Sequence, residues 1–208
     1  TSVRSSPQLI AARCPPASSR RRTTRPPVHG RGGRTSNAQW PVATASPRRR
    51  AQLSKIFRAA AFCEVRGNVH TRLKKIADGY ADGTVLAQAG LSRLGIAKFE
   101  GLRFDVLPLT TMVPAAGQGA ICLQTRATDA PMFSEILDKQ TAYAVNLERA
   151  ILARLGGGCQ VAVGVHWQNE KLYLFDEAKG GLKMFNIPVA ALADIPAQVE
   201  ALFKNDLA

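Results

Sequence analysis

The sequence predicts a mixed α/β protein in which a layer of parallel strands and helices is followed by a small α+β domain. Two patterns support this fold class. Strand and helix patterns alternate between residues 51 and 94, and three strand patterns separated by turn residues follow one another between residues 160 and 187. The 208 residues, of which 46% are hydrophobic, suffice for one or two domains with a buried core.

The first half of the chain predicts alternating elements from residue 51 on. In order, these are a helix over 51–62, a short strand over 63–65, a helix over 68–77, a strand over 84–87 and a helical turn over 91–94. The helix over 68–77 has the clearest ends, because Asn68 is a suitable N-cap and Gly79 a suitable stop. Strands connected through helices in this way favour a parallel sheet.

The second half predicts the small α+β domain. The expected elements are a turn at Gly117 and Gly119, a buried strand over 120–125 that contains Cys122, helices within 131–155, strands over 160–167, 172–175 and 182–187, and a final helix over 190–203. Turns at Asn169 and at Gly180 separate the three strands. Three antiparallel strands with helices on one face are enough to fold as a unit.

Cys159 follows three glycines at the point where a helical pattern ends and an apolar strand pattern begins. Ala144, Leu147 and Ile151 recur at helical spacing before the glycines. Glycine leaves space around the sulfur, so the thiol could be alkylated. The simpler alternative is a small core residue that opens the strand, and the negative C-terminal end of a helix does not favour a thiolate.

The net charge of +13 is concentrated in the N-terminal segment. Eleven of the 28 basic residues are arginines within residues 1–50, where no Asp or Glu occurs, and the remaining chain is nearly neutral. Residues 1–43 are rich in Arg, Pro, Ser and Gly, so we expect them to be disordered. This segment could be an organelle transit peptide, a tail that binds nucleic acid or an acidic surface, or a fragment or shifted-frame translation that is not native.

The cysteines and the apolar runs limit the compartment. Cys14, Cys63, Cys122 and Cys159 form no CxxC pair and have no zinc-site spacing with a histidine, so no metal is expected. A reducing compartment fits this cysteine usage. No apolar run approaches the roughly 18 residues of a membrane span. We expect a cytoplasmic monomer without a membrane partner, or an organelle protein if the N-terminal segment is a transit peptide.

Four segments carry a specific pattern: RGNVHTR over 66–72, LAQAGLSRLG over 86–95, PAAGQGA over 114–120 and ERAILARLGGGCQVAVG over 148–164. In this order and at these separations they resemble the porphobilinogen deaminase family, also called hydroxymethylbilane synthase, of tetrapyrrole biosynthesis. The segment SPRRRAQL over 46–53 is similar to the arginine-pair segment of that family. The resemblance therefore covers about residues 44–208.

The resemblance implies a fold and an activity. The family has two doubly wound domains, like those of periplasmic binding proteins, and a third domain with a three-stranded antiparallel sheet. Residues 44–128 would be a remnant of the α/β core, and residues 129–208 would be the cofactor-attachment domain. The implied enzyme is a transferase that polymerises four porphobilinogen units, with loss of ammonia, to hydroxymethylbilane in porphyrin, heme or chlorophyll biosynthesis.

The resemblance also implies site residues. Cys159 would carry a covalent dipyrromethane cofactor through a thioether. The other cofactor contacts would be Ser46, Arg48, Arg49, Arg66, Arg72 and Arg93, and the substrate contacts would be Arg66, Arg72, Arg93, Gly117 and Gln118. Planar guanidinium groups suit the carboxylates of a pyrrole ligand.

Local chemistry supports these residues but also offers simpler roles for them. We expect Arg66 and Arg72 to gather at the positive N-terminus of the helix over 68–77, and Arg93 to lie near backbone N–H groups of a strand-to-helix connection. Each arginine could instead be solvated, Ser46 could be only a helix N-cap, and residues 117–119 could be only a turn.

One part of the family pattern is missing. Family members carry a lysine and the catalytic aspartate in an N-terminal motif of the form HS(M/L)KD(L/V)P, whereas no Asp or Glu precedes Glu64 in this chain. A leader would precede the first domain rather than replace it, and the chain starts at Thr1 rather than Met. We therefore favour the shifted-frame explanation for residues 1–43 and expect low activity, with no catalytic residue assigned.

The alternative function is a non-catalytic basic protein that binds nucleic acid or an acidic partner through its arginine-rich N-terminal tail. The composition of the tail supports it. No aromatic residues are interleaved with the arginines, and the rest of the chain is nearly neutral, so we do not expect a nucleic-acid partner.

Overall fold

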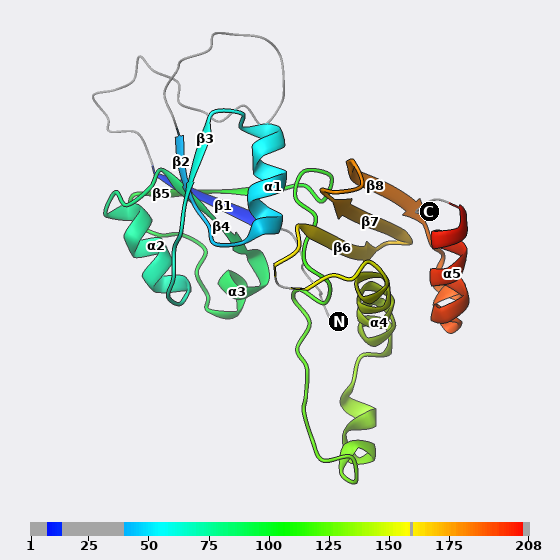
Figure 1. Ribbon diagram of the computed structural model, residues 1–208. Coiled ribbons are helices and arrows are strands. Elements are labelled where there is room, and N and C mark those ends of the chain that lie inside the picture. The colour runs from blue at the N-terminus through cyan, green and yellow to red at the C-terminus, as the bar shows by residue number, and fades with distance from the viewer. Residues whose placement is uncertain (1–7, 14–39, 159, 206–208) are drawn as a thin grey trace. The chain divides into compact units, whose positions relative to one another are not determined.

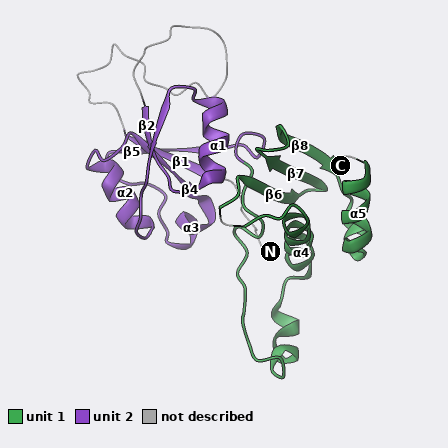
Figure 2. Ribbon diagram, viewed as in Figure 1, with its two compact units in different colours: residues 1–7, 113–208 green, residues 8–112 purple. Residues whose placement is uncertain are grey.

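A computed structural model of the chain describes residues 8–13, 40–158 and 160–205. It divides into two compact units (Figure 2), of which unit 2 holds Gln8–Met112 and unit 1 holds Val113–Ala208. The units thus divide between Met112 and Val113, whereas the sequence predicted a domain boundary after residue 128. The predicted domains stay a prediction.

Unit 2 is a five-stranded sheet with helices on both faces. Its strands are β1 (Gln8–Arg13), β2 (Trp40–Ala43), β3 (Ala60–Cys63), β4 (Gly83–Ala87) and β5 (Leu102–Leu107), in the order β3-β2-β4-β1-β5. β2 is parallel to β3 and to β4, while β1 is antiparallel to β4 and β5. The helices are α1 (Pro47–Ile56), α2 (Val69–Ala77) and α3 (Gln88–Arg93), as Figure 1 shows.

The two faces of this sheet have separate hydrophobic cores, because successive side chains of a strand point to opposite faces. Ile10 lies in one core with Leu53 of α1. Leu9 and Ala11 lie in the other core, together with residues of α2 and α3. This confirms the predicted α/β fold with a doubly wound arrangement.

The predicted disorder of residues 1–43 was wrong for two segments, which form β1 and β2. β1 lies between β4 and β5, and Gln8 to Ala12 are buried. Its sequence QLIAAR is apolar on both faces, which is typical of a strand inside a sheet covered on both sides. The overall composition concealed this short apolar run. Residues 1–7 and 14–39 lie outside the described residues.

Other predictions for unit 2 need smaller corrections. The helix predicted over 51–62 is α1, which begins at Pro47 and ends at Ile56, and the strand after it begins at Ala60 instead of Cys63. β5 was not predicted, although Leu102, Phe104 and Val106 alternate with Arg103 and Asp105 in the pattern of a strand. The two charged side chains lie on one face of the strand and pair there, with 2.7 Å between Arg103 Nε and Asp105 Oδ2. The predicted helix with the Asn68 N-cap is confirmed as α2.

Unit 1 contains the predicted three-stranded antiparallel sheet. Its elements are η2 (Ala130–Ile136), α4 (Lys139–Arg154), β6 (Val163–Gln168), β7 (Lys171–Asp176), β8 (Gly181–Asn186), η3 (Val189–Ala193) and α5 (Ile195–Asn205). The strand order is β6-β7-β8 with antiparallel pairing throughout. This confirms the second part of the predicted fold. The final predicted helix over 190–203 is two separate elements, η3 and α5.

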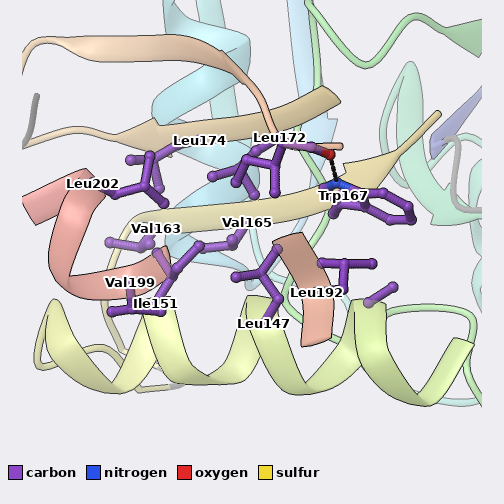
Figure 3. Close-up of a cluster of buried hydrophobic side chains, with 12 residues drawn as sticks. Leu147, Ile151, Val163, Val165, Trp167, Leu172, Leu174, Leu192, Val199 and Leu202 are labelled. Carbon is purple, nitrogen blue, oxygen red and sulfur yellow. Dashed lines mark hydrogen bonds between the residues drawn. The ribbon is translucent and has the colours of Figure 1, made fainter. Parts of the chain in front are cut away.

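The core of unit 1 lies between α4 and the sheet (Figure 3). Leu147 and Ile151 of α4 pack with Val163 and Val165 of β6. Trp167, at the end of the same strand face, donates from its indole Nε1 to the carbonyl oxygen of Ile187 over 2.9 Å. The core therefore fixes β6 directly on α4.

The prediction of a buried strand over 120–125 was wrong. These residues are in no strand or helix, Ile121 is 72% exposed, and Cys122 is exposed. The alternation of apolar residues in AICLQT is typical of a strand, but a strand also needs a neighbour for its backbone groups. No other described residue pairs with this segment as a strand.

Candidate functional site

The predicted arginines follow parallel strands of unit 2. β2, β3 and β4 lead into α1, α2 and α3, respectively. The carboxyl ends of parallel strands lie at one edge of a sheet, and ligands of open α/β sheets bind outside that edge. The candidate site therefore lies at this edge. We call it the carboxyl edge, and it comprises residues 44–50, 64–72 and 88–93.

Ser46 begins α1 as its N-cap. Its Oγ accepts a hydrogen bond from the Arg49 amide over 3.4 Å, and its own amide donates to Thr44 Oγ1 over 3.2 Å. Pro47 follows at the first helical position, where its missing N–H is not needed. The N-cap role of Ser46 is thus confirmed, and its contact with a cofactor stays a prediction.

Arg48 and Arg49 place two guanidinium groups in the first turn of α1. Arg48 is buried, and this burial, together with the charge of Arg49, lowers the pKa of Arg48 to about 9. Burial also lowers the pKa of Arg49 to about 10, with the charge of Arg72 as the second cause. Like charges from two helices therefore lie near one another at the carboxyl edge, because Arg49 acts on Arg48 and Arg72 acts on Arg49.

Arg49 is only partly satisfied by the protein. Its Nη1 donates to the carbonyl oxygen of Val85 over 2.8 Å, which holds the side chain against β4. Its buried Nε has no hydrogen-bond partner among the described residues. Buried polar groups almost always have a partner, so an N–H in this situation can bind an acceptor on a ligand.

Arg72 lies in the first turn of α2, where its side chain is held by the loop that precedes the helix. Its Nε donates to the carbonyl oxygen of Gly67 over 2.7 Å. Gly67 has a φ of +116°, and a Cβ there would lie 2.8 Å from Thr71 Cγ2, so the loop requires glycine. The Asn68 side chain caps the helix by accepting from the Thr71 amide over 2.8 Å. The predicted location of Arg72 at the N-terminus of α2 is thus confirmed.

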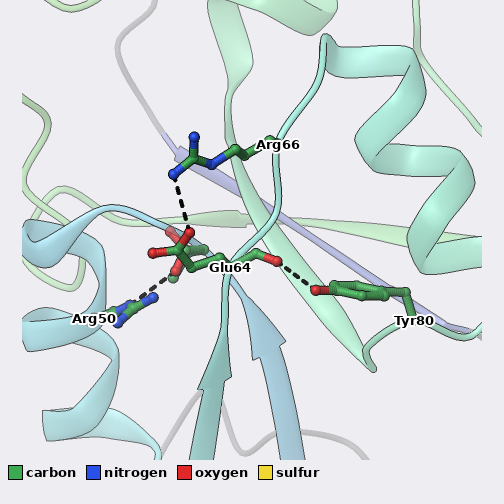
Figure 4. Close-up of polar contacts among 5 residues, drawn as sticks. Arg50, Glu64, Arg66 and Tyr80 are labelled. Carbon is green, nitrogen blue, oxygen red and sulfur yellow. Dashed lines mark hydrogen bonds and ion pairs between the residues drawn. The ribbon is translucent and has the colours of Figure 1, made fainter.

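Arg66 lies at the start of the same loop but is turned to solvent. Its side chain is 86% exposed, and its Nη2 is 3.5 Å from Glu64 Oε2 (Figure 4). The hydroxyl of Tyr80 donates to the carbonyl oxygen of Glu64 over 2.7 Å, and Arg50 Nε donates to that of Thr44 over 3.0 Å. The bond from Tyr80 fixes the backbone two residues before Arg66, whose guanidinium group stays exposed.

Arg93 does not lie where it was expected. It is the last residue of α3 and is exposed, so it lies at the carbonyl end of that helix rather than near free backbone N–H groups. A cation suits the negative C-terminal end of a helix. The expectation about its surroundings was wrong, and its contact with a ligand stays a prediction.

The turn of residues 115–119 belongs to unit 1. Gly117 and Gly119 have φ values of +73° and +86°, which confirms the predicted turn. The Gly117 amide donates to Glu148 Oε2 over 2.7 Å, and the Gln118 amide donates to the carbonyl oxygen of Ala115 over 3.0 Å. Both amides are therefore engaged within unit 1. The predicted substrate contacts of Gly117 and Gln118 stay predictions, and they would need other atoms of the turn.

Glu148 was not predicted from the sequence. It is fully buried in α4, where its Oε1 accepts from the Trp167 amide over 2.8 Å and lies 3.0 Å from His166 Nδ1. One sequence signal could have identified it. Glu148 follows Ala144 by four residues and precedes Ile151 by three, so this charged residue lies within the apolar stripe of the helix.

Cys159 lies outside the described residues. Before it, α4 ends at Arg154, and Gly156 has a φ of +66°, as expected for a helix stop. After it, β6 begins at Val163. Cys63 and Cys122 are free thiols, the first half-buried and the second exposed. The attachment of a cofactor at Cys159 stays a prediction.

Residues 8–13, 40–158 and 160–205 contain no group of three His, Cys, Asp or Glu side chains that could hold a metal ion. In the same part of the chain, no helix has the length and apolar character required to cross a membrane.

Comparison with known proteins identifies two family models. One, described as "Porphobilinogen deaminase, dipyromethane cofactor binding domain", matches residues 19–134, which is more than half of the chain. The other, described as "Porphobilinogen deaminase, C-terminal domain", matches residues 142–175. The two matches contain the carboxyl edge and most of α4, β6 and β7, respectively.

Curated relatives carry the same name. A porphobilinogen deaminase of Roseiflexus sp. (strain RS-1) is 42% identical over 138 residues, and that of Helicobacter hepaticus is 44% identical over 138 residues. A probable porphobilinogen deaminase of Archaeoglobus fulgidus is 40% identical over 125 residues. These matches cover 64%, 64% and 60% of the chain, but only 45%, 42% and 43% of the relatives. The chain therefore spans less than half the length of these relatives.

Proposed function

The chain belongs to the porphobilinogen deaminase family, and we propose that it is a hydroxymethylbilane synthase chain whose carboxyl edge binds the carboxylates of pyrrole ligands. The proposed reaction is the polymerisation of four porphobilinogen units, with loss of ammonia, in tetrapyrrole biosynthesis. The observation that carries the proposal is the meeting of Arg48, Arg49 and Arg72 at one sheet edge, where burial and like charge lower the pKa of the first two.

The physical reason is the cost of burying like charges. Each guanidinium group loses hydration when it is buried, and the neighbouring cations add repulsion. An anionic ligand reverses both effects by accepting hydrogen bonds and by supplying opposite charge. Porphobilinogen carries an acetate and a propionate group, and a planar guanidinium can bind a carboxylate through two parallel N–H groups. The carboxyl edge therefore favours a ligand with several carboxylates.

The described residues also fit the dipyrromethane cofactor that the family implies. The unpartnered Nε of Arg49 can donate to a carboxylate of that group, beside the charges of Arg48 and Arg72. Ser46, Arg66 and Arg93 are the further proposed contacts, and Cys159 is the proposed thioether attachment. When bound, the cofactor supplies the pyrrole carbon on which the product chain is extended. The chain's own arginines hold and orient the carboxylates.

We further propose that this chain alone turns over porphobilinogen slowly. The HS(M/L)KD(L/V)P motif of the family does not occur in these 208 residues, and no Asp or Glu precedes Glu64. Removing one preorganised electrostatic group typically lowers the rate of an enzyme by about 10²- to 10³-fold. A cytoplasmic monomer stays a prediction. The alternative of a nucleic-acid-binding protein has no support from the comparisons.

The attachment of the cofactor can be tested by mass spectrometry. The chain is produced in a host that makes porphobilinogen, and its intact mass and its peptides are analysed. We expect an adduct with the mass of dipyrromethane on the peptide that contains Cys159. It should be lost in Cys159→Ser and kept in the matched control Cys122→Ser. An adduct on Cys122, or an unmodified chain in the same host, would contradict the proposal.

A further inference from the structure

One edge of β6 in unit 1 is bonded to a loop carbonyl and to a side chain. β6 pairs with β7 on one side, and no described strand pairs with its other side. Two of its backbone amides nevertheless have partners outside the sheet. The Val165 amide donates to the carbonyl oxygen of Pro114 over 3.0 Å, and the Trp167 amide donates to Glu148 Oε1 over 2.8 Å. These amides are two residues apart, as expected for one edge of a strand.

The segment from Val113 to Gly117 lies along this edge. A Cβ on Gly164 would lie 2.8 Å from the carbonyl oxygen of Val113, so the segment approaches the strand too closely for any side chain at that position. At Trp167 the segment provides no carbonyl acceptor, and the Glu148 side chain takes that place. Its second oxygen, Oε2, accepts from the Gly117 amide over 2.7 Å. One carboxylate thus connects β6 with the turn of residues 115–119.

The donors around Glu148 require this carboxylate. Its oxygens accept from two backbone amides, and a backbone N–H can only donate. His166 Nδ1 is 3.0 Å from Oε1, within hydrogen-bond distance of the same carboxyl group. His166 is fully buried, and its Nε2 has no partner among the described residues, so the ring has no second polar contact there. Two backbone amides and the ring of His166 therefore depend on one side chain.

From this geometry we propose that Glu148 is the positioning residue of the turn at 115–119, and that the turn presents its remaining polar groups to the pyrrole ligand only while Glu148 holds it. The second clause rests on the proposed function, because that function predicts Gly117 and Gln118 as substrate contacts. The first clause does not depend on it. Glu148 acts through the turn and is not itself a ligand contact.

Glu148→Gln separates the acceptor role from the size of the side chain. Glutamine fills the same space but presents one oxygen and one NH₂ group, so it faces either Gly117 or the β6 donors with a donor of its own. The matched control is Glu200→Gln in α5. The Glu200 side chain is 73% exposed, and it is 3.9 Å from Arg154, so this substitution changes the same charge at a solvated position.

Amide hydrogen exchange at single residues tests the first clause. A hydrogen bond to a charged group contributes about 1.5–3 kcal/mol, which corresponds to about a 10- to 100-fold change in local opening. In Glu148→Gln we expect the Gly117 amide to exchange at least about tenfold faster than in the unaltered chain, with no change in Glu200→Gln. Equal protection of Gly117 in all three proteins would overturn the proposal. An unprotected Gly117 amide in the unaltered chain would also overturn the proposal, and this measurement does not require the variant to fold.

Titration of the same proteins with porphobilinogen tests the second clause. We expect Glu148→Gln to bind about tenfold more weakly than the unaltered chain and Glu200→Gln to bind equally well. Faster exchange at Gly117 with unchanged binding would overturn the positioning of the ligand and leave Glu148 with a structural role. Absence of binding by the unaltered chain would instead overturn the proposed function, and the exchange result would still decide whether Glu148 holds the turn.

Discussion

Each unit contains buried charged side chains, but the groups that surround them differ. In unit 1, the carboxylate of Glu148 accepts hydrogen bonds from Gly117 and Trp167 and lies beside His166. In unit 2, Arg48 and Arg49 lie close to further cations, and burial lowers the pKa of both. The carboxylate in unit 1 accepts from donors of its own unit, whereas the cations in unit 2 repel one another and would be stabilised by an added anion. The proposed binding site in unit 2 therefore rests on the sign of the neighbouring groups and not on buried charge alone.

The helix N-termini show the same difference. α4 begins with Asp138, whose negative charge suits the positive end of a helix. α1 begins with the neutral Ser46 and then places Arg48, Arg49 and Arg50 in its first turns, where cations are unfavourable. The cations in the first turns of α1 lower the stability of this helix, and an anion bound there would offset their charge.

The largest expected effect comes from breaking the satisfied site. Glu148→Ala leaves the amides of Gly117 and Trp167 and the ring of His166 without their partner. We expect the free energy of unfolding to fall by about 3 kcal/mol, because removing one partner of a buried polar group leaves the others uncompensated. Thermal unfolding measures this as a decrease in Tm of roughly 6–12 °C. The exposed control Glu200→Ala should change stability by less than about 0.5 kcal/mol. A similar small change in both variants would contradict the account.

A smaller effect of opposite sign is expected in unit 2. Arg48→Met replaces a buried cation by an apolar side chain of similar length, so the free chain should be more stable by about 1 kcal/mol at pH 7. Chemical denaturation measures this gain.

The gain should also depend on pH in a defined direction. The pKa of Arg48 is lowered from 12.5 to about 9 in the folded chain. Above pH 9 the folded chain releases this proton before the unfolded chain does, so the stability of the unaltered chain rises with pH relative to Arg48→Met. The advantage of the variant should therefore be largest below pH 9 and shrink above it. A variant that is less stable than the unaltered chain at pH 7 would show that the buried charge is already neutralised.

The smallest effect is expected at the N-cap of α4. The Thr141 hydroxyl, followed by the Thr141 amide at 2.6 Å, lowers the pKa of Asp138. Asp138 thus stabilises the folded chain above its unfolded pKa, and this contribution is lost as the pH falls through the lower folded value. Asp138→Asn should behave like the unaltered chain at pH 7 but lack this loss in acid. Thermal unfolding between pH 2 and 7 measures the difference, and identical profiles would exclude the role of the cap.

The sequence predicts the parts of the fold in which local pattern and packing agree. α2 with its Asn68 cap, α4 and the three strands after it follow from periodicity and turn residues. β1 could not be predicted, because its six residues lie in a segment with the composition of a disordered chain. Residues 120–125 have the pattern of a strand without the partner that a strand needs. Local sequence contains no information about long-range pairing of this kind.

The residues of the candidate site were proposed from the sequence, but their environment was not. The arginines were found through the resemblance to the family, and the sheet topology explains why they follow parallel strands. The burial of Arg48 and the partly unsatisfied Arg49 depend on packing against β4, which a sequence pattern does not contain. Arg93 was misplaced because the end of α3 could not be located from a short helical pattern. Glu148 could have been found, since a charged residue in an apolar stripe calls for a partner.

The central claim is that the cations of the carboxyl edge bind pyrrole carboxylates, and calorimetric titration of the purified chain with porphobilinogen tests it most directly. The matched pair of variants is Arg49→Gln at the carboxyl edge and Arg149→Gln on an exposed part of α4. Both remove one positive charge. We expect Arg49→Gln to raise the Kd by about tenfold or more, through loss of charge-assisted hydrogen bonds, and Arg149→Gln to leave it unchanged. Equal affinities for all three proteins, or equal losses in the two variants, would contradict the claim.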